Sequence, residues 1–381
     1  MENPTLPMEM MREILLRLPV RSVLRFKCVC KTWYSLISEP HFGISHYHMD
    51  AAPSYRFLLP STGLYFESVD TDPHLPQHFS AVHLPIPPFR YMYELSTRKH
   101  ILGSCRGLLL FYYHVGQFSD LILGNPSTGI YQRLPNFETP NLFLNDIRSK
   151  FLYGFGYDAS TEDYLLILIP SPLYIYRYRG PRKIHVFSFK THSWNLYYTN
   201  VLYADFIIKF RSGSLFNGAL HWLVYDHKNH LVILAFDLTQ RTSSKIPLLY
   251  RCNVNSVFSF SVLGECLCLC LRDRYRYCEM SEIWVMKEYR VRSSWTKLID
   301  IPFIYPLHIT KDGGIFGIYG IDGISRSLRL AKFNNKGELV DSFVYDGDQV
   351  CYYASLKSSL YRESLLSLPS VVGEQNENDQ Q

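Results

Sequence analysis

The sequence lacks the features that mark secreted and membrane-spanning proteins. No window reaches the roughly 18 apolar residues that a transmembrane helix needs, and residues 1–11 lack the basic and apolar regions of a signal peptide. The nine cysteines are odd in number and show no framework spacing. Both Asn-x-Ser/Thr sequences, at Asn3 and Asn125, are blocked by proline. We therefore expect a cytoplasmic or nuclear protein with free thiols and no membrane partner.

Motifs for catalysis and cofactor binding are also missing. Neither Gly-x-Ser-x-Gly nor His-Glu-x-x-His occurs, and no pair of carboxylates is set apart by its spacing. Residues 103–107 have the outline of a glycine-rich loop, but a strand pattern follows where a phosphate site needs a helix N-terminus. We therefore interpret that loop as a turn, and we expect no enzyme activity and no cofactor.

Two clusters of metal-ligand residue types have simpler interpretations. The cysteines of Cys266–Cys270 alternate with leucine, which places all three on one face of a strand. They lack the Cys-x-x-Cys geometry of a zinc site, so we interpret them as buried core residues. His41, His46 and His48 have no cysteine or carboxylate pair at ligand spacing, and we expect a solvated connection and no metal there.

The composition is that of a folded chain rich in β-structure. Of its 381 residues, 47% are hydrophobic and 19% are charged, which is enough apolar material for a packed core. The 29 tyrosines and 24 phenylalanines favour strands. The net charge of +5 is spread along the chain, so it does not by itself indicate a nucleic-acid partner.

Residues 6–38 have the periodicity of short helices. Apolar residues recur at three- and four-residue steps from Met11 to Leu18, and Pro19 ends that stretch. Two further stretches, 20–28 and 29–37, repeat the pattern. The pattern predicts three helices. A unit of about 40 residues cannot bury all its apolar side chains, so some of them are expected to form a docking surface for another protein.

From residue 51 onward the pattern changes to short strands. Alternating apolar runs such as 107–113, 164–169 and 231–236 are each bounded by turn residues. Turns followed by an apolar strand recur at intervals of 46 to 60 residues, beginning near Gly107, Asp158, Gly218, Gly264 and Gly314. Repeats of this length are typical of propeller blades, and the length of the region predicts roughly six of them.

The N-terminal segment resembles an F-box. The Leu-Pro start at Leu6, the Ile-Leu-x-x-Leu-Pro-Val centre at Ile14 and the Cys-Lys-x-Trp close at Cys30 all stand at the family spacing. The resemblance implies binding to the Skp adaptor of a ubiquitin ligase. The residues that it implies as contacts are Leu6, Pro7, Ile14, Leu15, Leu18, Pro19, Val20, Leu24, Val29 and Trp33.

The rest of the chain resembles the plant F-box-associated interaction domain, a group that includes F-box/kelch-repeat and S-locus F-box proteins. Matching pieces include Asn125–Thr128, Gly154–Asp158, Asn217–Trp222 and Ser294–Leu298, in family order. The expected fold is mainly β, with a small N-terminal α module of three helices followed by a β-propeller-like domain of roughly six blades. The expected domains are an F-box at 1–40, a linker at 41–54, a substrate-binding propeller at 55–370 and a disordered tail at 371–381.

Two segments interleave arginine with tyrosine, around Tyr176, Arg177 and Arg179 and around Arg274 and Arg276. Tyrosine and arginine are favoured in protein-recognition loops, and we take these five residues as candidate substrate contacts. The same pattern fits a nucleic-acid surface or a solvated blade edge. These alternatives stay open at this point.

The resemblance therefore predicts a non-catalytic substrate receptor of a Skp–cullin–F-box ubiquitin ligase. Its partners would be the Skp adaptor, through it the cullin and RING subunits, and a target protein of unknown identity. An adaptor-binding protein that acts outside a ligase and a nucleic-acid-binding propeller are the alternatives.

Overall fold

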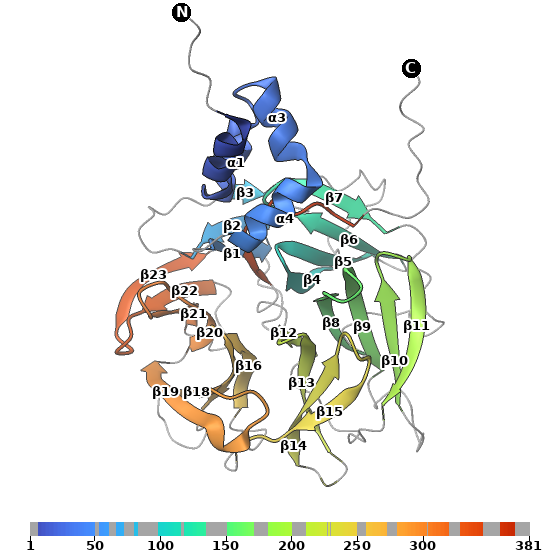
Figure 1. Cartoon of the computed structure of the whole chain (residues 1–381). Helices are drawn as coiled ribbons and strands as arrows, with labels where there is room; N and C mark the ends of the chain where they lie inside the picture. Colours follow the sequence, from blue (N-terminus) through green and yellow to red (C-terminus); the bar gives the residue numbers. More distant parts are fainter. Residues whose placement is uncertain are drawn as a thin grey trace, which may run out of the picture.

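A small helical unit sits on a ring of six four-stranded sheets (Figure 1). The computed structural model describes residues 7–49, 53–60, 66–71, 80–82, 98–115, 118–134, 151–170, 182–199, 211–226, 228, 230–249, 257–272, 280–302, 304–319, 328–345 and 359–369. Within these ranges, no helix has the length and the apolar character needed to cross a bilayer.

Four helices form the N-terminal unit, and they are α1 (Met8–Leu16), α2 (Val20–Phe26), α3 (Lys31–Ser38) and α4 (Pro40–Met49). Pro7 and Pro19 immediately precede α1 and α2 in extended backbone. Cys30 precedes α3, and its sulfur accepts a hydrogen bond from the backbone N–H of Trp33. The first three helices are those predicted from the periodicity.

Helix α4 corrects the expectation that residues 41–54 form a solvated linker. It covers residues 40–49, and its side chains at Phe42 and His46 are buried. The imidazole Nε2 of His46 lies 2.8 Å from the carbonyl oxygen of Leu18. Helix α4 shows little apolar periodicity. Its buried residues Phe42 and His46 are four positions apart, and both contact the helical unit. Tertiary packing therefore stabilises a helix that its sequence pattern does not predict.

Each sheet forms one blade of the ring. Its strands pair in the order of the chain, except for the first strand of blade 1. Blade 1 contains β24 (Leu360–Arg362), β1 (Tyr55–Pro60), β2 (Phe66–Asp70) and β3 (Ser80–Val82). Blade 2 contains β4 (Arg98–Cys105), β5 (Leu108–Val115), β6 (Phe118–Asn125) and β7 (Ile130–Arg133). Blade 3 contains β8 (Phe151–Asp158), β9 (Asp163–Pro170), β10 (Arg182–Ser188) and β11 (Ser193–Thr199).

The remaining three blades follow the same plan. Blade 4 contains β12 (Ser214–Phe216), β13 (Ala219–Tyr225), β14 (Leu231–Asp237) and β15 (Ser243–Ile246). Blade 5 contains β16 (Val257–Leu263), β17 (Cys266–Leu271), β18 (Met280–Met286) and β19 (Trp295–Pro302). Blade 6 contains β20 (Ile304–Ile309), β21 (Ile315–Tyr319), β22 (Leu328–Phe333) and β23 (Leu339–Tyr345). The predicted six-bladed propeller is confirmed.

The turns found in the sequence are the hairpins between the first and second strands of blades 2 to 6. Gly107 and Gly218 have positive φ, and so do Arg106 and Asn217 before them. Positive φ at both central residues is the hairpin geometry that matches strand twist. Blade 1 has no such turn, because its first strand, β24, comes from the other end of the chain and pairs antiparallel with β1.

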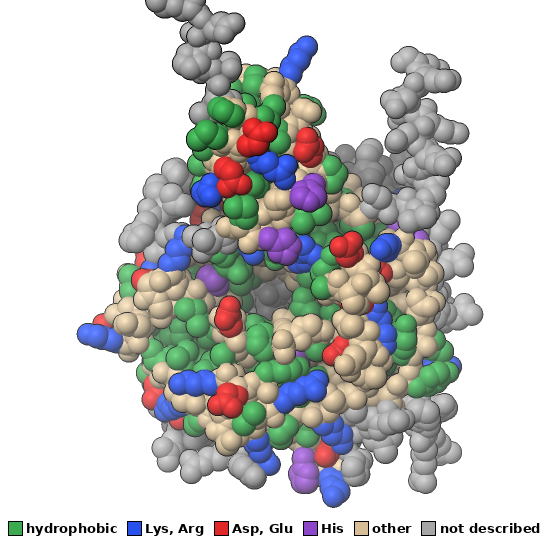
Figure 2. All heavy atoms as spheres, in the orientation of Figure 1, with side chains coloured by type: hydrophobic (Ala, Val, Ile, Leu, Met, Phe, Trp, Pro, Cys, Tyr) green, Lys and Arg blue, Asp and Glu red, His purple; other side chains and the backbone are tan. Residues whose placement is uncertain are grey.

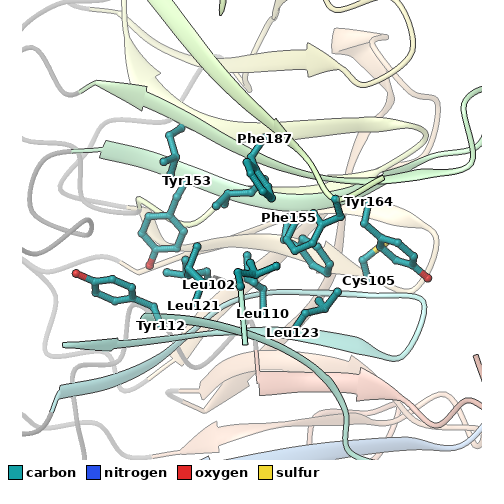
Figure 3. Packing of buried hydrophobic residues seen from close by; sticks show 14 of the residues in the cluster. Leu102, Cys105, Leu110, Tyr112, Leu121, Leu123, Tyr153, Phe155, Tyr164 and Phe187 are labelled. Carbon is teal, nitrogen blue, oxygen red and sulfur yellow. The ribbon is translucent and has the colours of Figure 1, made fainter. Parts of the chain in front are cut away.

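Separate apolar cores lie between neighbouring blades. Figure 3 shows the core between blades 2 and 3, where Leu110 and Leu123 face Phe155 and Phe187. The same arrangement recurs around the ring. Cys268 and Cys270 are fully buried between blades 5 and 6, with Cys266 partly buried against them, as expected of core residues.

A buried histidine lies on the second strand of blade 4. His221 is fully buried, with Nδ1 3.2 Å from the carbonyl oxygen of Ser214 and Nε2 2.8 Å from the hydroxyl of Tyr289. Since a carbonyl only accepts, Nδ1 carries the proton and Nε2 accepts from the tyrosine. Burial lowers the pKa of His221 from 6.5 to about 4, so it is neutral at pH 7.

We expect the protein to lose stability as the pH falls from 6.5 to 4. In this window the unfolded chain protonates its histidines while the folded chain keeps His221 neutral, so the unfolded state binds more protons. His308, whose pKa burial also lowers to about 4, contributes with the same sign. His221→Gln should reduce the loss of unfolding free energy between pH 6.5 and pH 4 by about 3 kcal/mol at most, which urea unfolding at several pH values would measure. His230→Gln, at an exposed histidine, is the control, and an unchanged slope in His221→Gln would contradict the assignment.

Candidate functional site

Apolar side chains are exposed on the helical unit, which stands at the top of Figure 2. Of the residues predicted to contact an adaptor, Pro7, Ile14, Pro19 and Val29 are exposed. The exposed fractions of Ile14 and Val29 are 49% and 61%. Side chains this apolar and this exposed on a folded unit are typical of a docking site.

The other predicted contact residues are less accessible. Leu15 and Val20 are buried in the core of the four helices, with only 1% and 4% of their surface exposed. Leu18, Leu24 and Trp33 are partly buried and pack against that core. Leu15 and Val20 therefore stabilise the helical unit, and their role as adaptor contacts stays a prediction. Leu6 lies outside the described residues.

The structure adds exposed apolar residues that were not predicted as contacts. Met8, Met10 and Tyr34 are 44%, 54% and 59% exposed. Met10 and Ile14 are four residues apart on α1, so they lie on the same face of that helix. That spacing was available in the sequence, and it identifies the outward face as well as the inward one.

Trp33 connects α3 to both other helices of the motif. Its indole N–H donates to the sulfur of Met11 at 3.2 Å, and its ring meets that of Phe26 edge to face at 5.1 Å. Such aromatic contacts contribute roughly 0.5–1.5 kcal/mol beyond burial alone. Trp33 therefore fixes the spacing of α1, α2 and α3, and so shapes the exposed surface.

The C-terminal strand and the residues after it attach the helical unit to the propeller. Arg21 on α2 donates to the Glu363 carboxylate at 3.0 Å. Arg362 donates to the carbonyl oxygen of Tyr47 on α4 at 2.7 Å, with its guanidinium 4.0 Å from the centre of the tyrosine ring. Leu365 completes the core of the four helices. The apolar surface is therefore held at a defined position relative to the blades.

Two family models match the chain. Residues 4–45 match the F-box domain, and residues 79–336 match the F-box associated beta propeller domain. The chain belongs to the F-box proteins with this propeller.

Curated relatives of this F-box protein come from Arabidopsis thaliana. It is 32% identical over 330 residues to F-box/kelch-repeat protein At3g23880, covering 80% of this chain and 83% of the relative. It is 28% identical over 339 residues to F-box protein CPR1, covering 81% of this chain and 78% of the relative. Among solved structures, TolB from Acinetobacter baumannii aligns with a TM-score of 0.45 at 11% identity, over 85% of this chain and 72% of that one.

The candidate substrate contacts Tyr176, Arg177, Arg179, Arg274 and Arg276 lie outside the described residues. Their flanking strands are described: the two segments join β9 to β10 and β17 to β18. Both connect the second and third strands of a blade, so their attachment points are opposite the tight turn between the first and second strands. In the described part of the chain, no group of three His, Cys, Asp or Glu residues is placed to hold a metal ion.

We expect Gly43→Val to loosen the contact between the F-box and the propeller. A Cβ atom at Gly43 would lie 2.6 Å from the backbone oxygen of Leu365, so either α4 or the C-terminal segment must shift. Such overpacking costs about 1–3 kcal/mol, which urea unfolding would measure. Ile44→Ala changes the next residue of α4, which is exposed, and is the control. Equal stability of Gly43→Val and wild type would show that this contact does not hold the F-box in place.

Proposed function

We propose that this F-box protein is the substrate-recognition subunit of a Skp–cullin–RING ubiquitin ligase. The observation that carries the proposal is an exposed apolar F-box surface joined firmly to a six-bladed propeller. The F-box surface would bind the Skp adaptor, and loops of the propeller would bind a target protein, as loops on a rigid scaffold commonly do.

In this role the chain performs no bond chemistry. It holds a target lysine close to the ubiquitin-carrying enzyme, which raises the effective concentration of one reactant near the other. This mechanism requires a fixed distance between the two binding surfaces. The contacts of Arg21 and Arg362 across the F-box and propeller supply that rigidity. We propose that it acts in the cytoplasm or nucleus, which the absence of a disulfide spacing in the sequence supports.

Affinity purification of the tagged full-length chain from plant cells tests the proposal. Recovery of the Skp adaptor together with cullin and RING subunits, identified by mass spectrometry, is the expected result. Adaptor without cullin would favour a sequestering protein, and RNA retained with a steep dependence on salt would favour a nucleic-acid-binding propeller. Purification of the intact chain without adaptor would overturn the proposal.

A further inference from the structure

A cavity of about 430 Å³ opens at the centre of the propeller face that meets helix α4. Figure 2 shows the hollow in the middle of that face, below the helical unit. The first strand of every blade contributes to its wall, and Tyr47 of α4 lies at its edge. The volume is within the range of small-molecule sites, and a single side chain or chain terminus would also fit.

Arg106 contributes a guanidinium group to this cavity. Arg106 is half-buried and lies in the turn between β4 and β5, where it has a positive φ of 52°. Its guanidinium stacks 3.9 Å from the ring centre of Tyr157 and 5.2 Å from that of Tyr47. No acidic side chain among the described residues forms an ion pair with it. A half-buried cation without a counter-charge favours binding of an anion.

A second guanidinium lies on the same wall. The guanidinium group of Arg362 lies 4.0 Å from the ring centre of the same tyrosine, Tyr47, and donates to its backbone carbonyl oxygen. The two arginines, both lining the cavity, are therefore held in place by aromatic rings. Stacking leaves the edge of the Arg106 guanidinium group accessible to an acceptor, because its N–H groups lie in the guanidinium plane, at right angles to the stacking direction.

The remaining wall mixes aromatic and apolar side chains with serine and glycine residues. Phe155 and Leu307 line it, and the ring of Tyr55 packs 4.4 Å from that of His308. Burial lowers the pKa of His308 to about 4, so at pH 7 it adds no charge. Glu265 is the acidic residue in the lining, and it is exposed. Among the described lining residues, two arginines and one glutamate (2 − 1) give a formal charge of +1.

We propose that this cavity binds a compact carboxylate with a flat apolar body, the carboxylate meeting Arg106 and the body lying against the aromatic side chains Tyr47 and Tyr55. The source of the carboxylate is either a free aromatic acid or the C-terminal residue of a peptide. Both present the same chemistry to the site. The proposal does not depend on binding of an adaptor to the F-box.

Fluorine NMR of the full-length chain tests it, with 4-fluorobenzoate as the probe and uncharged 4-fluorobenzamide as its match. We expect saturable binding of the acid and at least about tenfold weaker binding of the amide, since a charge-assisted hydrogen bond is lost. Arg106→Gln should weaken binding of the acid to a similar extent. Arg290→Gln is the control, because Arg290 also has positive φ and lies over a tyrosine but does not line the cavity.

Glu265→Gln gives a test that does not depend on losing an interaction. Removing the negative charge from the rim should strengthen binding of the acid. N-acetyl-glycyl-phenylalanine and its C-terminal amide form the peptide arm. Tighter binding of this acid than of 4-fluorobenzoate would identify a peptide terminus as the source, and the reverse would identify a free acid. Equal binding of acids and amides, unchanged affinity in Arg106→Gln, or no binding of either acid at millimolar concentration would overturn the proposal.

Discussion

Replacing two exposed F-box residues with aspartate, Ile14→Asp and Val29→Asp together, is expected to weaken adaptor binding at least about 100-fold. The side chains are 49% and 61% exposed, so the folded chain tolerates the charges in water. A complex that covers them would have to remove both carboxylates from water, which costs several kcal/mol without a partner. A loss of about 2.7 kcal/mol is already 100-fold in the dissociation constant.

The matched control for this variant is Leu196→Asp with Tyr198→Asp on the outer strand β11, where the wild-type residues are 44% and 54% exposed. Titration calorimetry against the purified Skp adaptor would measure both variants. Substitutions at Leu18 are less informative, because Leu18 is partly buried against the helical core and its loss would also affect folding. An adaptor affinity within about threefold of wild type in the Ile14 and Val29 variant would place the adaptor elsewhere.

Removing residues 359–381 is expected to unfold the protein. The deletion takes away β24, which is the first strand of blade 1, and with it the buried Tyr361, Leu365 and Leu366. Truncating one buried leucine typically costs 2–5 kcal/mol, and total stabilities are about 5–15 kcal/mol. The ring would also be left open at blade 1, with the edge of β1 unpaired.

Removing residues 370–381 alone is the control for this deletion, since it leaves every described contact of the C-terminal segment in place. Soluble yield, circular dichroism and thermal unfolding would compare the two truncations. We expect the shorter deletion to match wild type and the longer one to be insoluble or unfolded. A cooperative transition near the wild-type temperature in the longer deletion would show that closure of the ring by β24 does not limit stability.

Much of the fold could be predicted because each blade repeats a local pattern. The turn near Gly107 or Gly218 is formed by residues adjacent in sequence, so its spacing reveals the blade. Closure of blade 1 by β24 pairs residues about 300 positions apart, and no local pattern encodes that pairing. With β24 added, β1, β2 and β3 form an ordinary blade.

The family motif Asn125–Thr128 gains a structural explanation. Asn125 is buried, and its side-chain amide donates to the carbonyl oxygens of Ser364 at 3.0 Å and Leu366 at 2.9 Å. The motif thus holds the segment that follows β24. Its role was not predictable from sequence, because the partner is more than 230 residues away.

The F-box surface could be predicted only in part. A motif gives the residues of the unit, but it does not separate those that face inward from those that face outward. Leu15 and Val20 turn inward to the core, while Met10 and Tyr34 turn outward. Helix α4 was not predicted because its apolar residues show little helical periodicity, although Phe42 and His46 pack against the helical unit.

Titration of the full-length chain with the purified Skp adaptor tests the central claim most directly. We expect a one-to-one complex with a sub-micromolar dissociation constant and a negative heat-capacity change, because apolar F-box side chains are buried. No detectable binding by a chain whose thermal unfolding is cooperative would contradict the account of this protein as a ligase receptor.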